Sequence, residues 1–280
     1  MNSWYFLVDF LLPFQWTGHL FMKNALLAVL LVTPIFGILG TMVVNSRMAF
    51  FSDSIGHGAF TGIAIGTVLG GIQPIWAATV FSIIFAVTIT IIKNKSRAST
   101  DTIIGVFSST AIALGLVILS HGGSFNKFSA YLIGDLLSIN SSEIFLLLGV
   151  FLSVLVLWLL IFNKILINSI NQSLAASRGI NTLLFEMLFT AAIAFVVTIT
   201  IQWVGLLIIN SLLVLPAAAA RNITANVRQY HLASVAIALI SGVSGLILSY
   251  YFNTATGATI VLVAAVFFFI TFALRGRLHG

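Results

Sequence analysis

Apolar stretches long enough to cross a lipid bilayer fill most of this sequence. A membrane-spanning α-helix needs roughly 17 to 25 predominantly apolar residues. Apolar windows of roughly this length fall at 20–44, 57–73, 75–92, 101–120, 142–163, 182–201, 205–220, 230–251 and 257–274. Only 6% of the residues are charged, against about 25% in an average soluble domain, so the outer surface must face lipid. The sequence therefore predicts an all-α, polytopic transmembrane helical bundle of about nine spans, with eight as the alternative, in one domain covering residues 1–280.

The basic residues indicate how the spans are oriented. Cytoplasmic loops of membrane proteins carry an excess of Lys and Arg. With a cytoplasmic carboxyl terminus, ten of the twelve basic residues fall on the cytoplasmic side, and only Lys23 and Lys127 fall outside. The ten are Arg47, Lys93, Lys95, Arg97, Lys164, Arg178, Arg221, Arg228, Arg275 and Arg277. We therefore expect the amino terminus outside the cell and the carboxyl terminus in the cytoplasm. Because these charges lie singly at the ends of apolar segments, they do not indicate a nucleic-acid surface.

Two segments on the expected outer side are not plain loops. Residues 4–17 carry the aromatic residues Trp4, Tyr5 and Trp16, and residues 125–141 are moderately apolar. Both are expected to lie at the membrane interface or to re-enter the bundle.

A stripe of glycines marks one helix in particular. Gly58, Gly62, Gly66 and Gly70 recur every four residues and therefore share one helix face. Small residues in that register allow two helix backbones to approach closely, so we interpret the glycines as a packing seam. Such packing does not by itself account for two polar residues at the start of the same segment.

Those polar residues are Asp53 and His57, which are four positions apart and therefore adjacent on one helix face. An oxygen donor beside a nitrogen donor suits a borderline divalent cation such as Zn²⁺ or Mn²⁺. Two ligands predict a transit site, because a fully coordinated ion would leave too slowly for transport. The alternative is structural: Asp53 caps its own helix and His57 bonds a neighbouring carbonyl. Ionisable residues at membrane depth favour the functional interpretation.

The remaining acidic residues have simpler explanations. Asp101 precedes an apolar span and is predicted to cap a helix. Asp135 and Glu143 lie on the expected outer side, where admission of a cation is the alternative to a cap or loop role. Glu186 lies one turn inside a span and is expected to face the bundle interior or to pair with Arg178.

Several kinds of chemistry are excluded by the sequence. No lysine follows a glycine, so the Gly-Lys of a phosphate-binding P-loop is absent. H-E-x-x-H and G-x-S-x-G motifs are absent as well, and there are no cysteines to act as ligands or redox groups. The chain is therefore not expected to be an enzyme, and any ATP hydrolysis must occur on a partner.

Four stretches carry a family resemblance. They are GTMVVNSRMAFFSDSIGHGAFTGIAIG at 40–66, DTIIGVFSSTAIALG at 101–115, YLIGDLL at 131–137 and VGLLIINSLLVLPAAAA at 204–220. In these stretches, and essentially from end to end, the chain resembles the permease subunits of bacterial ABC-type zinc/manganese importers. Asp53 and His57 match the acidic and histidine positions that this family is thought to use along the metal path.

The resemblance implies a set of partners. A transmembrane permease domain of this family works as a homodimer or a paired permease in the bacterial inner (cytoplasmic) membrane, crossing the lipid many times. Two copies of a cytoplasmic ATP-binding subunit supply energy, and an extracytoplasmic metal-binding protein delivers the ion. Zinc is the first expectation and manganese the second, and the ion is a substrate, with no permanently bound cofactor.

The polar segment 163–181 is assigned to energy coupling by the same resemblance. Ala175 and Gly179 match the Ala-x-x-x-Gly of the family's cytoplasmic loop that contacts the ATPase. The acidic residues that often precede this alanine are replaced here by Asn171 and Ser173. On sequence alone, a solvated connector is the alternative for this segment.

A gradient-driven secondary transporter or channel is the alternative function. Such a protein would need further buried charges for coupling, and the sequence offers few. It would also continue to take up metal without a nucleotide-binding partner.

Overall fold

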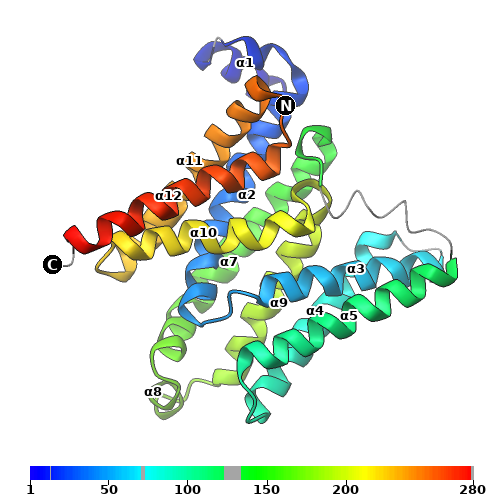
Figure 1. Ribbon diagram of the computed structural model, residues 1–280, viewed down its shortest axis with the longest axis vertical. Helices are drawn as coiled ribbons and strands as arrows, with labels where there is room; N and C mark the ends of the chain where they lie inside the picture. Colours follow the sequence, from blue (N-terminus) through cyan, green and yellow to red (C-terminus); the bar gives the residue numbers. More distant parts are fainter. Residues whose placement is uncertain (13, 71–72, 123–133, 279–280) are drawn as a thin grey trace. The chain divides into compact units, whose positions relative to one another are not determined.

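The structure is a computed structural model, and it describes the chain except for residues 13, 71–72, 123–133 and 279–280. The described residues form helices and no strand, which confirms the all-α prediction (Figure 1). In chain order the helices are α1 (Asn2–Leu11), η1 (Gln15–Gly18), α2 (Leu20–Asn45), α3 (Phe51–Leu69), α4 (Pro74–Lys95), α5 (Thr100–Gly122), η3 (Leu136–Ser138), α7 (Ser141–Ile170), α8 (Gln172–Ser177), α9 (Thr182–Val204), α10 (Leu206–Ile223), α11 (Val227–Phe252) and α12 (Thr256–Leu278).

Each apolar window of the sequence forms a helix. Within the described residues, seven helices are long and apolar enough to cross a bilayer, namely α2, α4, α5, α7, α9, α11 and α12. The other two windows correspond to α3, which is enriched in glycine and polar residues, and to α10, whose apolar part is the shorter stretch Ile208–Ile223. Helix α3 begins at Phe51, six residues before its apolar window, because Ser52, Asp53 and Ser54 lower the hydropathy of a segment that is nevertheless helical.

The chain forms two compact units. Unit 1 contains Met1–Thr41, Ile133–Ser153 and Trp203–Gly280, and unit 2 contains Met42–Leu132 and Val154–Gln202. Unit 1 therefore holds α1, most of α2, the first part of α7, and α10 to α12. Unit 2 holds α3, α4, α5, the second part of α7, α8 and most of α9. Part of the segment 125–141, including Lys127, lies outside the described residues.

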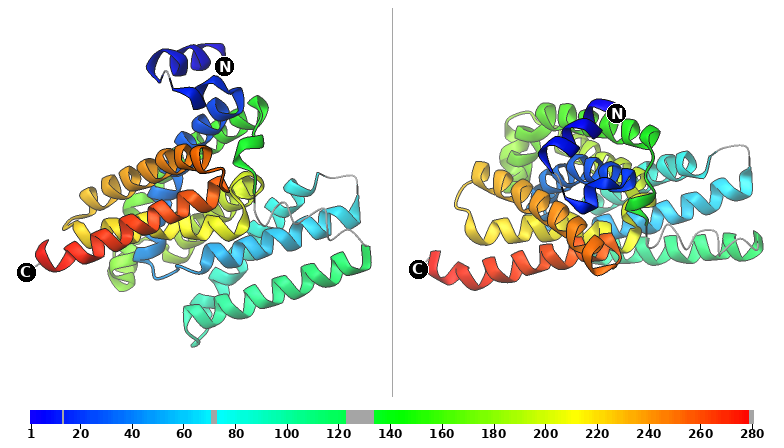
Figure 2. Two further views of the ribbon diagram at one scale, coloured as in Figure 1. Left: turned by 45° about the horizontal axis from the view of Figure 1, so that its top comes forward. Right: turned by 90° about the horizontal axis from the view of Figure 1, so that it is seen from above.

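Unit 1 is held together by close helix contacts. Helices α10, α11 and α12 pack against one another, and Figure 2 shows α11 and α12 side by side. A Cβ on Gly245 of α11 would lie 2.5 Å from the Cα of Ile260 in α12, so glycine is needed for this approach. Helix α11 also binds α2, because the Ser234 hydroxyl donates to the carbonyl of Gly37 at 2.7 Å. Small residues thus set the helix spacing in this unit.

Unit 2 is built on a helical hairpin. Gly70 ends α3 in the left-handed region at φ 65°, and Pro74 is the first residue of α4, where its missing N–H costs nothing. Helix α3 packs against both α4 and α5. The position of α3 is therefore fixed by two neighbours, and this helix carries Asp53 and His57.

Candidate functional site

Asp53 lies in the first turn of α3. The residue that caps the helix is Phe50, without a side-chain hydrogen bond, so Asp53 is not the cap that the structural alternative required. Phe51 and Met48, 0% and 2% exposed, hold the beginning of the helix in the core of unit 2. A carboxylate in this turn is stabilised by the amino-terminal end of the helix dipole. The sequence therefore places a negative charge where the fold favours one.

His57 lies one turn further along α3 and faces Asp53. Its Nε2 atom is 3.5 Å from Oδ2 of Asp53. The side chains are 22% exposed for His57 and 38% exposed for Asp53, so both donors remain accessible. The structure thus brings together the two residues that the spacing pairs, and leaves them open on one side.

The separation of these two donors suits a single ion. Donors 3.5 Å apart are near enough for one ion to bind both, since metal–ligand bonds are about 2.1 Å long. No group of three or more His, Cys, Asp and Glu side chains gathers among the described residues. Asp53 and His57 therefore form a partial coordination site that exchangeable ligands must complete.

The face of α3 that packs on α4 carries the glycine stripe. A Cβ on Gly58 would lie 2.8 Å from the Phe85 ring, one on Gly62 would lie 2.6 Å from the Cα of Ala78, and one on Gly66 would lie 2.7 Å from the Cβ of Ala77. The fourth glycine of the stripe, Gly70, meets no atom within 4 Å and instead ends the helix. Three glycines thus bring α4 close to α3.

The contact of α3 with α5 depends on a hydroxyl group. Thr61 donates to the carbonyl of Ala111 at 2.5 Å and, within α3, to the carbonyl of His57 at 3.2 Å. Gly115 of α5 leaves space for Phe60 and Thr61, because a Cβ there would be 3.0 Å from each. Packing on two sides therefore fixes the rotation of α3 about its axis, and with it the direction of Asp53 and His57.

Glu186 forms a contact that the sequence did not predict. It pairs with Lys93 of α4, and its Oε2 accepts from Asn94 at 2.8 Å. Its side chain is only 13% exposed, as expected for an interior position, and the alternative partner Arg178 is wrong. Arg178 lies beyond the end of α8, outside the helix that carries Glu186, so helical spacing does not join them. One turn further into α4, Thr90 and Thr190 share a hydrogen bond of 2.9 Å. A polar seam therefore joins α4 to α9.

The ion pair in this seam gives a test of unit 2. The side chains of Lys93 and Glu186 are only 18% and 13% exposed, so Glu186→Gln leaves the ammonium group without its counter-charge. We expect a loss of about 3 kcal/mol in unfolding free energy, while Lys93→Met combined with Glu186→Leu recovers most of it, because an apolar pair replaces a buried ion pair at little cost. Thermal unfolding of the purified protein in detergent measures both variants. A Glu186→Gln protein as stable as the wild type would contradict the pairing of Lys93 with Glu186.

The polar segment 163–181 contains the end of α7 and the short helix α8. The Asn171 side chain caps α8 by accepting from the N–H of Leu174 at 3.0 Å. Ala175 is fully buried, and its carbonyl accepts from Ile180 at 3.1 Å across a turn in which Gly179 has φ 73°. Around this closed turn Leu174 remains 44% exposed. Ala175 and Gly179 thus shape a compact, exposed helical turn.

The acidic residues at other helix ends have local roles. Asp135 accepts from the N–H of Leu137 at 3.1 Å and so caps η3. Glu143 accepts from the N–H of Asn140 at 2.9 Å at the start of α7. Asp101 lies in the first turn of α5, where the Ser99 hydroxyl accepts the capping hydrogen bond, so the predicted capping role of Asp101 is wrong. The hydrogen bonds of Asp135 and Glu143 account for the positions of those two residues.

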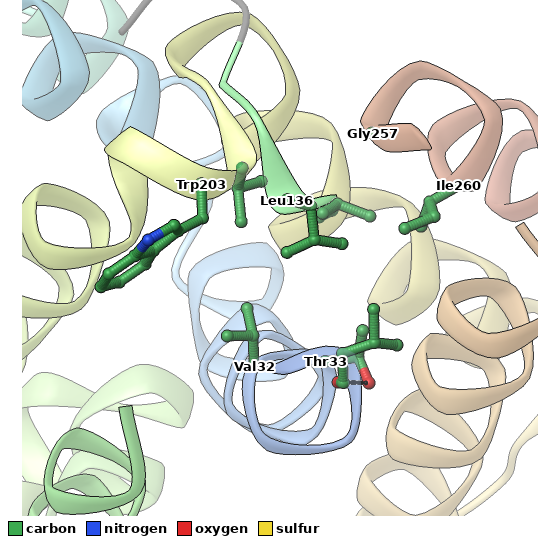
Figure 3. Close-up of a pocket in the computed structure, with 9 residues that line it drawn as sticks. Val32, Thr33, Leu136, Trp203, Gly257 and Ile260 are labelled. Atoms are coloured by element: carbon green, nitrogen blue, oxygen red, sulfur yellow. Dashed lines mark hydrogen bonds between the residues drawn. The ribbon is translucent and has the colours of Figure 1, made fainter. Parts of the chain in front are cut away.

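Unit 1 contains a cavity whose walls are apolar (Figure 3). Its lining residues are Val29, Val32, Thr33, Leu136, Trp203, Val204, Leu212, Gly257 and Ile260. The Thr33 hydroxyl already donates to the Val29 carbonyl at 2.8 Å, which Figure 3 draws as a dashed line. The cavity therefore offers no donor set for a cation. Its residues come from distant parts of the chain, and no local motif in the sequence indicates it.

Comparisons with known proteins agree with this architecture. A family model described as the ABC 3 transport family matches residues 18–275. ScaB of Streptococcus parasanguinis, a manganese import system permease protein, is 30% identical over 92% of this chain and 91% of its own length. ZnuB of Haemophilus influenzae, a high-affinity zinc uptake system membrane protein, is 31% identical over 91% of this chain and 97% of its own length.

A solved structure resembles the whole fold as well. PsaBC from Streptococcus pneumoniae in complex with Fab superposes with a TM-score of 0.79 at 29% identity, covering 97% of this chain and 95% of that chain. The match of the family model extends from the beginning of α2 to near the end of α12 and includes Asp53 and His57. The chain belongs to the ABC 3 transport family.

Proposed function

We propose that this chain is the membrane-spanning permease subunit of an ATP-binding-cassette importer that moves divalent metal ions into the cytoplasm. The observation that carries the proposal is the pair Asp53 and His57, with donor atoms 3.5 Å apart and partly exposed on a helix fixed from two sides. The names of the relatives, a manganese permease and a zinc uptake protein, support the choice of substrate. An oxygen donor beside a nitrogen donor suits both Zn²⁺ and Mn²⁺, of which zinc is our first choice.

The site would bind its ion in passing. A carboxylate and a neutral imidazole supply two ligands, and water or a second permease protomer supplies the rest, so the ion exchanges quickly. The imidazole must be deprotonated to bind a metal, and the adjacent ion then takes over the interaction with Asp53. The metal is the substrate of the protein, and no resident cofactor is required.

Helix α8 would couple ATP hydrolysis on a partner subunit to the permease. Its exposed turn, built on Ala175 and Gly179, supports contact with an ATP-binding subunit present in two copies on the cytoplasmic side. The amino terminus then lies outside, where an extracytoplasmic metal-binding protein delivers the ion. In this proposal α3 and α10 complete about nine spans, and residues 1–280 act as one permease domain, paired with a second copy in the bacterial cytoplasmic membrane.

Reconstitution in proteoliposomes tests this function. With the ATP-binding subunit and ATP inside the vesicles, and the loaded metal-binding protein outside, we expect uptake of radioactive zinc that stops when the ATP-binding subunit is omitted. A proton or sodium gradient without ATP is expected to drive no uptake. Uptake that continues without the ATP-binding subunit would instead establish the gradient-driven alternative.

A further inference from the structure

Helix α1 presents an apolar face that its own unit does not cover. Val8 is 1% exposed and points to the protein, whereas Phe6 and Phe10 are 74% and 77% exposed on the opposite side. Leu7 and Leu11, at 47% and 59%, widen the same exposed face. In a ten-residue helix this distribution leaves one apolar face buried and a second one uncovered.

Polar bonds fasten α1 to the beginning of α2. The Trp4 indole N–H donates to the carbonyl of Lys23 at 3.0 Å, and the Tyr5 hydroxyl donates to the Asn24 side chain at 2.9 Å. Asp9 lies 2.6 Å from the Lys23 ammonium group. Figure 1 shows α1 folded back over this end of α2. The helix is therefore held in one orientation, and its exposed face is a fixed feature of the molecule.

Lys23 explains why the Asp9 contact matters. It is only 6% exposed although it lies in the first turn of a candidate membrane span. A buried ammonium group without a counter-charge is costly, and Asp9 supplies that charge from α1. In the proposed topology Lys23 is also one of the two basic residues on the outer side. The ion pair with Asp9 neutralises Lys23, which is an exception to the rule that basic residues lie on the cytoplasmic side.

Aromatic side chains show at which depth α1 lies. Tyr250, at the end of α11, contacts His19, which immediately precedes α2, with 3.2 Å between the tyrosine hydroxyl and the histidine Nε2. The His19 ring stacks on Phe21, and Phe252 is 71% exposed nearby in the chain. Leu20, at the beginning of α2, is 62% exposed and is the first residue of a candidate membrane span. Amphipathic aromatic residues of this kind gather at membrane–water interfaces.

We propose that α1 is an interfacial helix that binds the lipid bilayer. Its exposed Phe6 and Phe10 enter the boundary between headgroups and acyl chains, and Leu20, the exposed first residue of the α2 span, lies in lipid. The ion pair between Asp9 and Lys23 links the interfacial helix to the first span. The binding partner is lipid, and this assignment does not depend on the transported ion.

Spin labelling tests the location of α1. The chain has no cysteine, so Phe6→Cys and Phe10→Cys each give one nitroxide site in the full-length protein. Leu159→Cys on α7, 74% exposed within a candidate span, serves as the lipid standard. Arg97→Cys, between α4 and α5, serves as the aqueous standard. The measurement compares collisions with oxygen and with a water-soluble nickel complex in nanodiscs of phosphatidylethanolamine and phosphatidylglycerol.

We expect both α1 labels to be several-fold more accessible to oxygen, relative to nickel, than the label at Arg97. Oxygen-to-nickel accessibility ratios at Phe6 and Phe10 equal to the ratio at Arg97 would overturn the proposal. Protection that appears only when a metal-binding protein is added, or only at high protein density, would also overturn it, since the face would then bind another protein or a second copy. As a second measurement, Asp9→Asn should lower the unfolding temperature, and Lys23→Met in the same chain should restore it.

Discussion

Replacing either Asp53 or His57 with alanine is expected to reduce zinc uptake about 10- to 100-fold while the protein remains folded. Each variant removes one of two donors that lie 3.5 Å apart, and each tenfold loss of uptake rate corresponds to about 1.4 kcal/mol of activation free energy. Both side chains are partly exposed, so their truncation leaves no core cavity, and the unfolding temperature should stay close to that of the wild type. Radioactive zinc uptake, normalised to the amount of protein in the membrane, measures the effect.

Asp101 provides the matched control for this prediction. Like Asp53 it is an aspartate in the first turn of a helix, but the residue four positions later is Gly105 instead of a histidine. Asp101→Ala should therefore transport zinc at close to the wild-type rate. Equal losses in Asp101→Ala and Asp53→Ala would show that a helix-end charge, and not a metal ligand, had been removed.

The second large effect is expected at Gly62. A Cβ added there would lie 2.6 Å from the Cα of Ala78 and 3.0 Å from the Cβ of Phe81. Backbone atoms cannot move aside cheaply, so Gly62→Ala must push α3 away from α4. We expect a loss of about 1 to 3 kcal/mol in unfolding free energy, and a larger loss for Gly62→Val. Because α3 carries the two donors, zinc uptake should fall with the helix displacement.

Gly105 of α5 serves as the control, because alanine at this position is not expected to lower the unfolding free energy. It meets no atom within 4 Å, so an added methyl group has room. Alanine has a helix propensity better than that of glycine by about 1 kcal/mol, and Gly105→Ala should be neutral or stabilising. Thermal unfolding of the two variants in the same detergent provides the comparison. A Gly62→Ala protein as stable as Gly105→Ala would contradict the close packing of α3 on α4.

The helices themselves were predictable because a membrane span has a simple signal. Long apolar stretches, bounded by basic or polar residues, gave every helix from α2 to α12 except the short ones. Hydropathy did not predict the first turn of α3, where Ser52, Asp53 and Ser54 lower the average. Hydropathy windows cannot locate such a boundary, since polar residues within a helix give the same low hydropathy as a loop.

The pairing of Asp53 with His57 was also predictable, because residues four apart on a helix are neighbours. The partner of Glu186 was not, since Lys93 is 93 residues away and the contact depends on how α4 lies beside α9. The same holds for the apolar cavity, whose residues Thr33, Leu136 and Trp203 come from three separate segments. Contacts within one helix follow from its periodicity, whereas contacts between helices require the packing.

Binding of the metal ion by Asp53 and His57 is tested most directly by the coordination of Mn²⁺ in the purified protein. Pulsed electron paramagnetic resonance, with ¹⁵N-labelled histidine in the chain, detects a histidine nitrogen bound to the metal. We expect a nitrogen coupling in the wild type that persists in His231→Ala and disappears in His57→Ala. A coupling that survives in His57→Ala, or a wild type with no histidine nitrogen on the metal, would contradict the assignment of Asp53 and His57 as the ligands.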